Sequence, residues 1–249
     1  MTGGPVRIRV VLFDLGGTLV DERDFSGWVG LARELFVDVG PDELAHAFSE
    51  VETAVDLDPL ALDREAAVVA FWRRVLSRAA GREVESATAD RFCNRVRATQ
   101  ADKPFPVFSD VRRCLASLAA ERRRLGIVSN STSEATVRAI LYRASILDPF
   151  ERIVSSGTEG VAKPDPEIFR RAVARMGVRP EETFYVGNLA QTDAAAAAAA
   201  GLHSAWLHRD GTGLSENPRE ITSLLEVPLV IRALERGGTV PDVGARSRR

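Results

Sequence analysis

The sequence predicts an α/β fold of three layers, in which a parallel sheet forms the core and an all-helical segment is inserted after the first strand. Three observations support this prediction. An apolar strand pattern opens the chain. A purely helical pattern follows over residues 22–100. Beyond residue 106, strand and helix patterns alternate, and strands separated by helices imply a parallel sheet with right-handed crossovers.

The first strand is predicted at residues 6–13. Apolar and basic residues alternate from Val6 to Val10, and the pattern then runs apolar through Phe13. Such a run is typical of a strand that is buried on both faces of a parallel sheet. Asp14 follows directly, and two glycines then interrupt the pattern. The first strand therefore ends on a carboxylate.

Four helices are predicted between residues 22 and 103. Gly40 and Gly81 have the character of helix ends, and Pro41 and Asp63 that of helix starts. Each helix carries apolar residues at helical spacing, namely Trp28, Leu31, Ala32 and Leu35, then Leu44, Ala47, Phe48 and Val51, then Val68, Phe71, Trp72, Val75 and Leu76, and finally Phe92 and Val96. Because no strand pattern lies among them, this stretch is interpreted as an all-helical domain.

The rest of the chain returns to the sheet through a linker at residues 103–106, where Lys103 is interpreted as a linker charge. Four further strands are predicted, at residues 125–128, 152–155, 183–186 and 204–207. Helical stripes lie between and after them, at residues 111–118, 137–141, 165–176, 194–200, and more weakly at 221–225 and 229–234. Asp165 and Pro166 are typical of an N-cap and of the first helical position.

These patterns divide the chain into three parts. Residues 1–21 and 104–236 form the α/β core, residues 22–103 the helical domain, and residues 237–249 a flexible tail rich in Gly, Pro and Arg. The first part is thus split in sequence by the second.

Composition narrows the functional classes. The chain has 249 residues and a formal net charge of −2, so nothing indicates a nucleic-acid or membrane partner. The two cysteines, Cys93 and Cys114, are too few for a disulfide framework and favour a reduced, intracellular setting. Residues 1–10 lack the pattern of a signal peptide, and no apolar run is long enough to span a bilayer. We therefore expect a cytoplasmic protein.

Polar side chains follow the predicted strands at the edge where ligands bind in open α/β sheets. They are Asp14, Ser129, Asn130, Lys163, Asn188 and, one turn further on, Asp193. Such a set suits attack on a phosphate, because it combines a carboxylate nucleophile, a positive charge, hydrogen-bond donors and a metal site. Taken singly, Asp14 could start a turn, Ser129 and Asn130 could cap a helix, and Asp193 could cap the Ala-rich helix.

Lys163 stands out by composition. Lys103 and Lys163 are the only lysines among 33 basic residues. A surface charge in this chain is nearly always Arg, whose fork is wide and planar, whereas Lys is a compact point charge. This choice favours a functional role for Lys163.

Four segments in order resemble the four motifs of the haloacid dehalogenase superfamily. They are VVLFDLGGTLV, which contains Asp14, LGIVSNST, which contains Ser129, VAKPDPEIF, which contains Lys163, and FYVGNLAQTDAAAAAAAG, which contains Asn188 and Asp193. The helical domain is similar to the cap that some members carry after the first motif. The resemblance covers roughly residues 6–210 and implies a Rossmann-like core.

The resemblance also implies roles for these residues. Asp14 would attack phosphorus and form an aspartyl phosphate, and Lys163 would neutralise both Asp14 and the phosphate. Phosphoryl oxygens would be bound by Ser129, Asn130, Gly17 and Thr18. Mg²⁺ would be held by Asp14, the Gly16 carbonyl, Asn188 and Asp193.

Two positions depart from the family pattern. Gly16 stands where most phosphatases of the family have a second Asp that acts as general acid and base, which typically contributes about 10²–10⁴ in rate. Asp21 or Glu22 is a hypothetical substitute. Asn188 stands where an Asp usually binds Mg²⁺, so we expect weaker metal binding and a larger share for Asp193.

Three functions follow as hypotheses. The first is a Mg²⁺-dependent phosphatase of a small phosphorylated metabolite, active as a monomer or homodimer, with substrate choice in the cap. The second is a binding or regulatory protein on a hydrolase scaffold with little or no turnover, which both departures favour. The third is a 2-haloacid dehalogenase, which needs neither metal nor second Asp; dehalogenases usually have an aromatic residue in place of Gly16.

Overall fold

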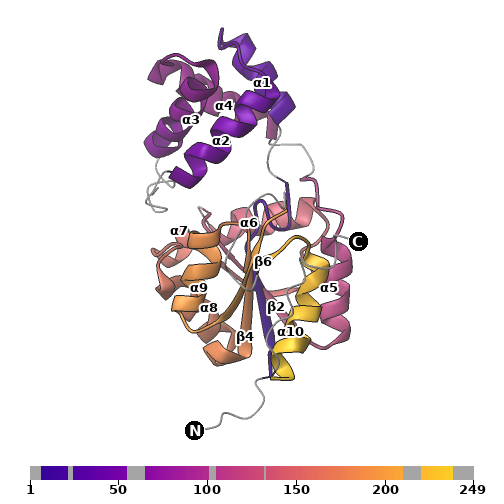
Figure 1. The fold of residues 1–249 in the computed structure, drawn as a ribbon. Helices are drawn as coiled ribbons and strands as arrows, with labels where there is room; N and C mark the ends of the chain where they lie inside the picture. The colour runs from indigo at the N-terminus through magenta and orange to yellow at the C-terminus, as the bar shows by residue number, and fades with distance from the viewer. Residues whose placement is uncertain are drawn as a thin grey trace. The chain divides into compact units, whose positions relative to one another are not determined.

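The computed structural model describes residues 7–21, 25–54, 65–100, 105–131, 133–209 and 220–237. The chain divides into two compact units, one made of residues 1–22 and 105–249 and the other of residues 23–104 (Figure 1). Asp63, Lys103 and the tail beyond residue 237 lie outside the described residues. Among the helices that are described, none is both long enough and apolar enough to cross a membrane.

The first unit is built on a six-stranded parallel sheet with the strand order β3-β2-β1-β4-β5-β6. Its strands are β1 (Val10–Phe13), β2 (Arg124–Ser129), β3 (Phe150–Ser155), β4 (Thr183–Gly187), β5 (His203–Leu207) and β6 (Glu220–Ile221). β1 is central, with β2 on one side and β4 on the other. All four of its residues are buried, as the apolar run predicts for a strand covered on both faces.

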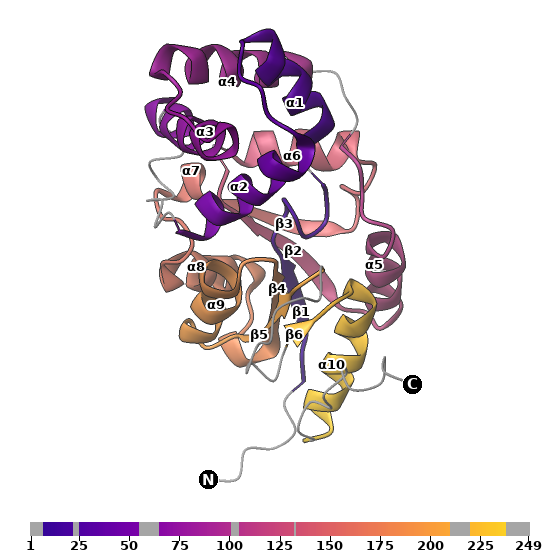
Figure 2. The same cartoon turned by 45° about the horizontal axis from the view of Figure 1, so that its top comes forward.

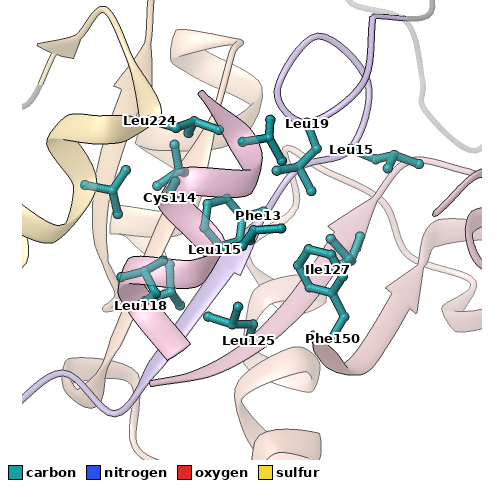
Figure 3. Packing of buried hydrophobic residues seen from close by; sticks show 14 of the residues in the cluster. Phe13, Leu15, Leu19, Cys114, Leu115, Leu118, Leu125, Ile127, Phe150 and Leu224 are labelled. Atoms are coloured by element: carbon teal, nitrogen blue, oxygen red, sulfur yellow. The ribbon is translucent and has the colours of Figure 1, made fainter. Parts of the chain in front are cut away.

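Helices cover both faces of this sheet, which gives the predicted Rossmann-like three-layer fold (Figures 1 and 2). They are α5 (Val111–Ala120), α6 (Glu134–Arg143), α7 (Ser156–Glu159), α8 (Pro166–Met176), α9 (Ala196–Ala199) and α10 (Val227–Glu235). Val11 and Phe13 of β1 pack with the apolar sides of α5, α6 and α10. Figure 3 shows Phe13 in this cluster with Cys114, Leu115 and Leu118 of α5. Val10 and Leu12 pack with those of α8 and α9. The alternation of side chains along one strand thus supplies both cores.

The second unit contains the four predicted helices, α1 (Phe25–Glu34), α2 (Pro41–Ala54), α3 (Glu65–Ala80) and α4 (Ser86–Gln100). Its core is a cluster of aromatic rings centred on Trp72. The Trp72 ring lies 4.8 Å from Trp28, 5.6 Å from Phe48 and 4.9 Å from Phe92, measured between centroids. The unit therefore has a hydrophobic core of its own.

Two N-caps show which polar residues stabilise the start of a helix and so have a structural role. Asp165 accepts a hydrogen bond from the Glu167 N–H, and Pro166 is the first residue of α8, as predicted. The cap of α6 is Ser133, which accepts from the Thr136 N–H. The sequence also allowed Ser129 and Asn130 to cap the following helix, but neither residue is the N-cap of α6.

Two elements differ from the sequence expectation. Residues 221–225 were expected to be helical, but Ile221 ends a sixth strand and Leu224–Glu226 form a single 3₁₀ turn. Ile221 is 1% exposed beside β5, so sheet pairing outweighs its weak helical pattern. The Ala-rich segment begins as a π-helix, Ala190–Ala195, before the short α9.

Candidate active site

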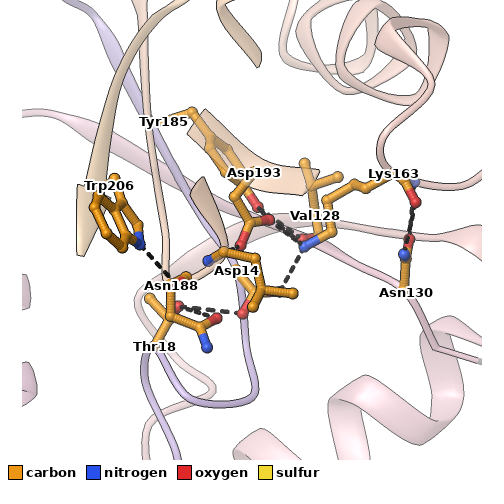
Figure 4. A network of polar contacts seen from close by, with 10 residues as sticks. Asp14, Thr18, Val128, Asn130, Lys163, Tyr185, Asn188, Asp193 and Trp206 are labelled. Carbon is orange, nitrogen blue, oxygen red and sulfur yellow. Dashed lines mark hydrogen bonds and ion pairs between the residues drawn. The ribbon is translucent and has the colours of Figure 1, made fainter. Parts of the chain in front are cut away.

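Asp14 lies at the carboxyl end of the central strand, where the sequence predicts the nucleophile. Its backbone N–H donates to the Val186 carbonyl of β4 at 2.9 Å. Flanking strands and covering helices leave it 8% exposed. The carboxylate is therefore held by rigid elements, with one oxygen directed to a buried cation and the other to a group of oxygen atoms (Figure 4).

The buried cation is the Lys163 ammonium, which is 3% exposed. Its Nζ lies 2.6 Å from Asp14 Oδ1, 2.7 Å from Asp193 Oδ1 and 3.1 Å from the Tyr185 hydroxyl. Three residues that the sequence assigns to one site are thus in direct contact, and the three protons of the ammonium have three acceptors. Tyr185 is an addition that sequence reasoning missed. Its place in β4, two residues before the end of that strand, was the available signal.

Asn130 holds the Lys163 loop by its backbone. The Asn130 side chain donates to the Lys163 carbonyl and accepts from the Lys163 N–H, both at 2.9 Å. It was expected to bind phosphate, but both ends of its amide are engaged with the loop. Its observed contacts make it a positioning residue for the ammonium.

Asp193 is turned toward Lys163. Its Oδ1 accepts from Lys163 and, at 2.8 Å, from the Tyr185 hydroxyl, and its Oδ2 accepts from the Leu189 N–H at 3.0 Å. A Cβ on Gly187 would overlap this carboxyl group, so glycine is required there. Both oxygens accept hydrogen bonds within the protein, and the expectation that Asp193 also binds Mg²⁺ stays a prediction.

Oxygen atoms converge on the other side of Asp14. The end of the Asn188 amide that faces Asp14 lies 3.3 Å from Asp14 Oδ2 and 3.2 Å from the Gly16 carbonyl. Without a cation, these two acceptors are satisfied when the amide turns its nitrogen toward them. With the amide oxygen facing them, three oxygen atoms lie close together, a donor set that suits a hard cation such as Mg²⁺. The donor set therefore fits Mg²⁺, with Asp14 as its one carboxylate.

The loop after Asp14 is closely packed. The Thr18 hydroxyl donates to Asp14 Oδ2 at 3.1 Å, and Thr18 is fully buried. Gly17 has φ +74°, and a Cβ there would overlap the Asn188 side chain, so only glycine fits. The Gly17 N–H donates to the Val20 carbonyl at 2.9 Å. The Gly17 N–H and the Thr18 hydroxyl, which were expected to bind phosphate, thus donate to acceptors within the protein. Ser129 ends the neighbouring strand at the same sheet edge.

Burial and charge set the protonation of the site. Burial, opposed by Lys163 and reinforced by Asp193, raises the pKa of Asp14 to about 6. Burial opposes the charge of Lys163 as well, but the two carboxylates outweigh it and raise the pKa of the ammonium. Burial and Asp193 raise the pKa of Tyr185 well above its usual value, so its hydroxyl remains a donor. At neutral pH most of Asp14 is therefore ionised, beside a charged Lys163.

Residues at the end of β5 support this loop, and the sequence pattern did not reveal them. The Trp206 indole N–H donates to the Asn188 carbonyl at 2.9 Å. Arg209 donates to the Thr18 carbonyl at 2.7 Å and to Asp110 Oδ2 at 3.0 Å. Of the two hypothetical acid–base residues, Asp21 donates its N–H to the Pro106 carbonyl, and Glu22 lies outside the described residues.

Comparison with known proteins gives a consistent result. Residues 8–201 match the family model of the haloacid dehalogenase-like hydrolases. The phosphoserine phosphatase of Thermus thermophilus is 31% identical over 105 residues, 42% of each chain. The glyceraldehyde 3-phosphate phosphatase of Pyrococcus furiosus is 30% identical over 128 residues, 50% of this chain and 53% of the relative. The chain therefore spans about half the length of these two relatives.

Other relatives match over nearly their whole length. The N-acylneuraminate-9-phosphatase of Rattus norvegicus is 24% identical over 249 residues, 93% of this chain and 97% of the relative. The magnesium-bound HAD-hydrolase YfnB of Bacillus subtilis has a TM-score of 0.69 at 19% identity, over 91% of this chain and 99% of that one. A 2-haloacid dehalogenase of Pseudomonas syringae has a TM-score of 0.56 at 23% identity, over 91% and 98%. At these identities the structural matches show the fold alone.

Proposed function

The chain belongs to the haloacid dehalogenase-like hydrolases, and from this premise we propose that it is a Mg²⁺-dependent phosphatase of a small phosphorylated metabolite. The observation that carries the proposal is the environment of Asp14. One carboxylate oxygen is paired with the buried Lys163, and the other faces the Asn188 amide and the Gly16 carbonyl. A nucleophile and a cation site thus share one carboxylate.

In the proposed reaction, Asp14 attacks phosphorus and forms an aspartyl phosphate, which water then hydrolyses. The main electrostatic obstacle is repulsion between Asp14 and the phosphate, about 4 kcal/mol for two unit charges 4 Å apart at an effective dielectric constant of 20. Lys163 reduces this repulsion and favours the ionised form of the nucleophile. Ser129, at the end of the neighbouring strand, is the proposed donor to a phosphoryl oxygen.

The charge of the site supports a need for a cation. Asp14 and Asp193 carry two negative charges and Lys163 one positive charge, so this buried group has a net charge of −1. A phosphate dianion would raise the negative charge further. Mg²⁺ held by Asp14, the Gly16 carbonyl and the Asn188 amide oxygen would supply the compensating charge. With Asn188 in place of a carboxylate, we expect this Mg²⁺ to bind weakly.

The helical unit is the proposed site of substrate choice, and its four helices have the position in the sequence that a cap has in this family. We propose a cytoplasmic monomer or homodimer whose partner is a small phosphorylated metabolite rather than a nucleic acid or a membrane. The near-neutral charge of the chain supports the exclusion of nucleic acid.

A second function is favoured by two departures from the family pattern. Gly16 offers a carbonyl where a carboxylate would exchange protons, and Asn188 replaces a charged ligand. A scaffold that binds a phosphorylated ligand with little turnover is consistent with both. Carbon–halogen hydrolysis is the third hypothesis, and the same experiment tests it.

The deciding experiment is phosphate release from a broad panel of phosphate esters and anhydrides, with Mg²⁺ or with EDTA. Wild type is compared with Asp14→Asn, which keeps the size of the side chain and removes the nucleophilic charge. We expect release that depends on both Mg²⁺ and Asp14. Absence of Asp14-dependent release on every compound, in variants shown to be folded by circular dichroism, would favour the binding scaffold. Chloride release from 2-chloropropionate without metal would favour the dehalogenase.

A further inference from the structure

Two loops of the sheet unit meet beside Asp14, and they are in contact. One follows β1 and carries Gly16, Gly17 and Thr18, and the other follows β4 and carries Asn188. The Gly16 carbonyl lies 3.2 Å from the Asn188 amide, and the Thr18 hydroxyl lies 3.4 Å from Asn188 Oδ1. A Cβ on Gly17 would overlap the Asn188 side chain. A small shift of either loop therefore changes the spacing of the oxygen atoms that are proposed to hold Mg²⁺.

The end of β5 holds the backbone of both loops. The Trp206 indole N–H donates to the Asn188 carbonyl at 2.9 Å (Figure 4). Arg209 Nη2 donates to the Thr18 carbonyl at 2.7 Å. The hydroxyl of the same Thr18 donates to Asp14 Oδ2, the carboxylate oxygen on the cation side. One short segment of chain thus fixes a carbonyl of each loop.

Trp206 is itself held in place by β6. Its ring stacks on the His208 imidazole, with 4.6 Å between the centroids and 8° between the planes. His208 Nδ1 lies 2.7 Å from Glu220 Oε1, and the His208 backbone N–H donates to the Ile221 carbonyl at 2.8 Å. Glu220 is also the register partner of Trp206 between β5 and β6. The two-residue strand β6 therefore helps to orient the indole N–H.

Arg209 is held by the start of α5. Its guanidinium lies over the Phe108 ring, 3.8 Å from the centroid, and Nη1 donates to Asp110 Oδ2 at 3.0 Å. The same Asp110 oxygen accepts from the Ser223 hydroxyl and from the Leu224 N–H, both at 2.9 Å. The side chains of this ion pair are 18% and 9% exposed, so solvent screens it little. The donor to the Thr18 carbonyl is thus fixed on several sides.

We propose that Trp206 and Arg209 are positioning residues for the Mg²⁺ site, because they fix the loop after β1 and the loop after β4 relative to each other and so set the affinity for the cation. The inference rests on the proposed function, since it takes Asp14, the Gly16 carbonyl and Asn188 as ligands of Mg²⁺. It adds that the affinity depends on two residues that act through the backbone of these loops.

The chemistry of the ligands explains why their placement matters. Mg²⁺ requires nearly ideal octahedral geometry, with oxygen atoms at about 2.0–2.1 Å. One carboxylate and two neutral oxygens attract it less strongly than several carboxylates would, so ligands that are already in place contribute more to binding. Groups that orient metal ligands typically contribute about 10–100-fold in metal affinity.

Binding of Mg²⁺ in the absence of substrate tests the inference. The dissociation constant is measured by isothermal titration calorimetry, and independently from the rise of the melting temperature with Mg²⁺ concentration. Trp206→Phe removes the indole N–H and keeps an aromatic ring. Arg209→Met removes the guanidinium and keeps a long side chain. Asp14→Asn removes the one carboxylate of the proposed ligand set.

Arg123 supplies the matched control, because it makes the same kinds of contact near the other end of β1. It donates to the Ile8 carbonyl, and its Nη2 lies 2.9 Å from Glu235 Oε2. Its side chain is 9% exposed. Arg123→Met therefore removes an arginine that joins a carboxylate to a backbone carbonyl, at the opposite edge of the sheet from the Mg²⁺ site.

We expect wild type to bind Mg²⁺, and we expect Trp206→Phe and Arg209→Met each to raise the dissociation constant by about tenfold or more. Arg123→Met should lower the melting temperature and leave the dissociation constant of Mg²⁺ unchanged. If Arg209→Met does not fold, Trp206→Phe, which removes one hydrogen bond to the site, still decides.

An unchanged dissociation constant in Trp206→Phe or in Arg209→Met, with binding that Asp14→Asn weakens, would overturn the role of that residue and leave the proposed function intact. An equal rise in Arg123→Met would overturn the inference as well, because a general loss of stability would then explain it. If wild type binds no Mg²⁺, or if Asp14→Asn binds it equally tightly, the Mg²⁺ site of the proposed function is overturned, and this inference with it.

Discussion

At the scale of single residues, the charges buried around Asp14 oppose the stability of the fold. Burial raises the pKa of Asp14 from 3.8 to about 6. A carboxyl group whose pKa is higher in the folded than in the unfolded chain contributes stability that is present below pH 3.8 and is lost as the pH rises through 6. For a difference of about two pKa units the loss is about 3 kcal/mol. The nucleophile therefore lowers the stability of the protein at the pH where it is ionised.

Replacement of Asp14 should reveal this cost. At pH 8 in EDTA, Asp14→Asn should melt at or above the temperature of wild type, because Lys163 keeps Asp193 as its partner. The difference should close as the pH falls toward 4. Lys163→Met is the contrasting variant, since it leaves two buried carboxylates without a cation, a loss of about 3–5 kcal/mol. Calorimetry across this pH range tests both, and a lower melting temperature for Asp14→Asn at pH 8 would contradict the account.

The raised pKa of Asp14 also predicts how kcat/KM falls at acid pH. With scarce Mg²⁺, kcat/KM should fall about tenfold per pH unit below pH 6, because Asp14 attacks only as the carboxylate. Raising the Mg²⁺ concentration should move this limb to lower pH, since a nearby cation favours the ionised form. Rate profiles between pH 4.5 and 8 at two Mg²⁺ concentrations provide the measurement. A limb that Mg²⁺ does not move would argue against Asp14 as both nucleophile and ligand.

The sequence predicts the meeting of Asp14, Lys163 and Asp193, because each follows a strand or loop at one sheet edge. It does not predict what each side chain contacts. The two hydrogen bonds between the Asn130 side chain and the Lys163 backbone depend on the positions of two loops 33 residues apart. Tyr185 looks like an ordinary apolar strand residue until its hydroxyl is placed between Lys163 and Asp193.

At the scale of elements, periodicity predicts long segments well and short ones poorly. The sequence of α8 carries signals for both ends of the helix, because Asp165 is its N-cap and Gly177, with φ 63°, is its C-cap. The strand Glu220–Ile221 has two residues, too few to show any period. The π-helix at Ala190–Ala195 has helix-forming residues throughout. Its wider turn coincides with the placement of the Asp193 carboxylate, in keeping with the frequent occurrence of π-turns at functional sites.

The turn from β4 into this π-helix depends on Gly187. Gly187→Ala should lower kcat and destabilise the fold by about 1–3 kcal/mol, because its Cβ would push the Asp193 carboxyl away from Lys163. Gly30→Ala in α1 is the matched control, since no atom lies within 4 Å of its added Cβ. That variant should be neutral or slightly stabilising. Equal effects of the two substitutions on kcat would show that the close approach at Gly187 is unimportant.

At the scale of the whole molecule, the two units have separate hydrophobic cores. The aromatic cluster around Trp72 belongs entirely to residues 23–104, and the clusters on the two sheet faces to the other unit. The sequence indicates this division through a change of period. The order of the strands is a property of the folded sheet, because several orders are compatible with the same alternation of strands and helices.

Separate cores predict separate responses to cavities. Phe92→Ala, at a fully buried ring beside Trp72, should cost the helical unit about 3–5 kcal/mol. Limited proteolysis followed by mass spectrometry should then show faster cleavage within residues 23–104 and unchanged cleavage within 105–209. Phe169→Ala, at a fully buried ring in a T-shaped contact with Tyr185, should give the reverse pattern. Uniform acceleration along the chain in either variant would mean that the units unfold together.

The pairing of the central strand has a consequence for the order in which the protein assembles during synthesis. β1 is made before the other strands of the sheet, but Val10 pairs with Arg124 and Thr183. At typical elongation rates of roughly 5–20 residues per second, its first partner is made on the order of 10 s later. The contacts within the helical unit are local, so that unit can fold while β1 waits. Asp14 is thus made well before Lys163 and Asp193 and reaches its working surroundings only after both, and a nascent chain released before residue 193 would lack the Asp193 that anchors Lys163.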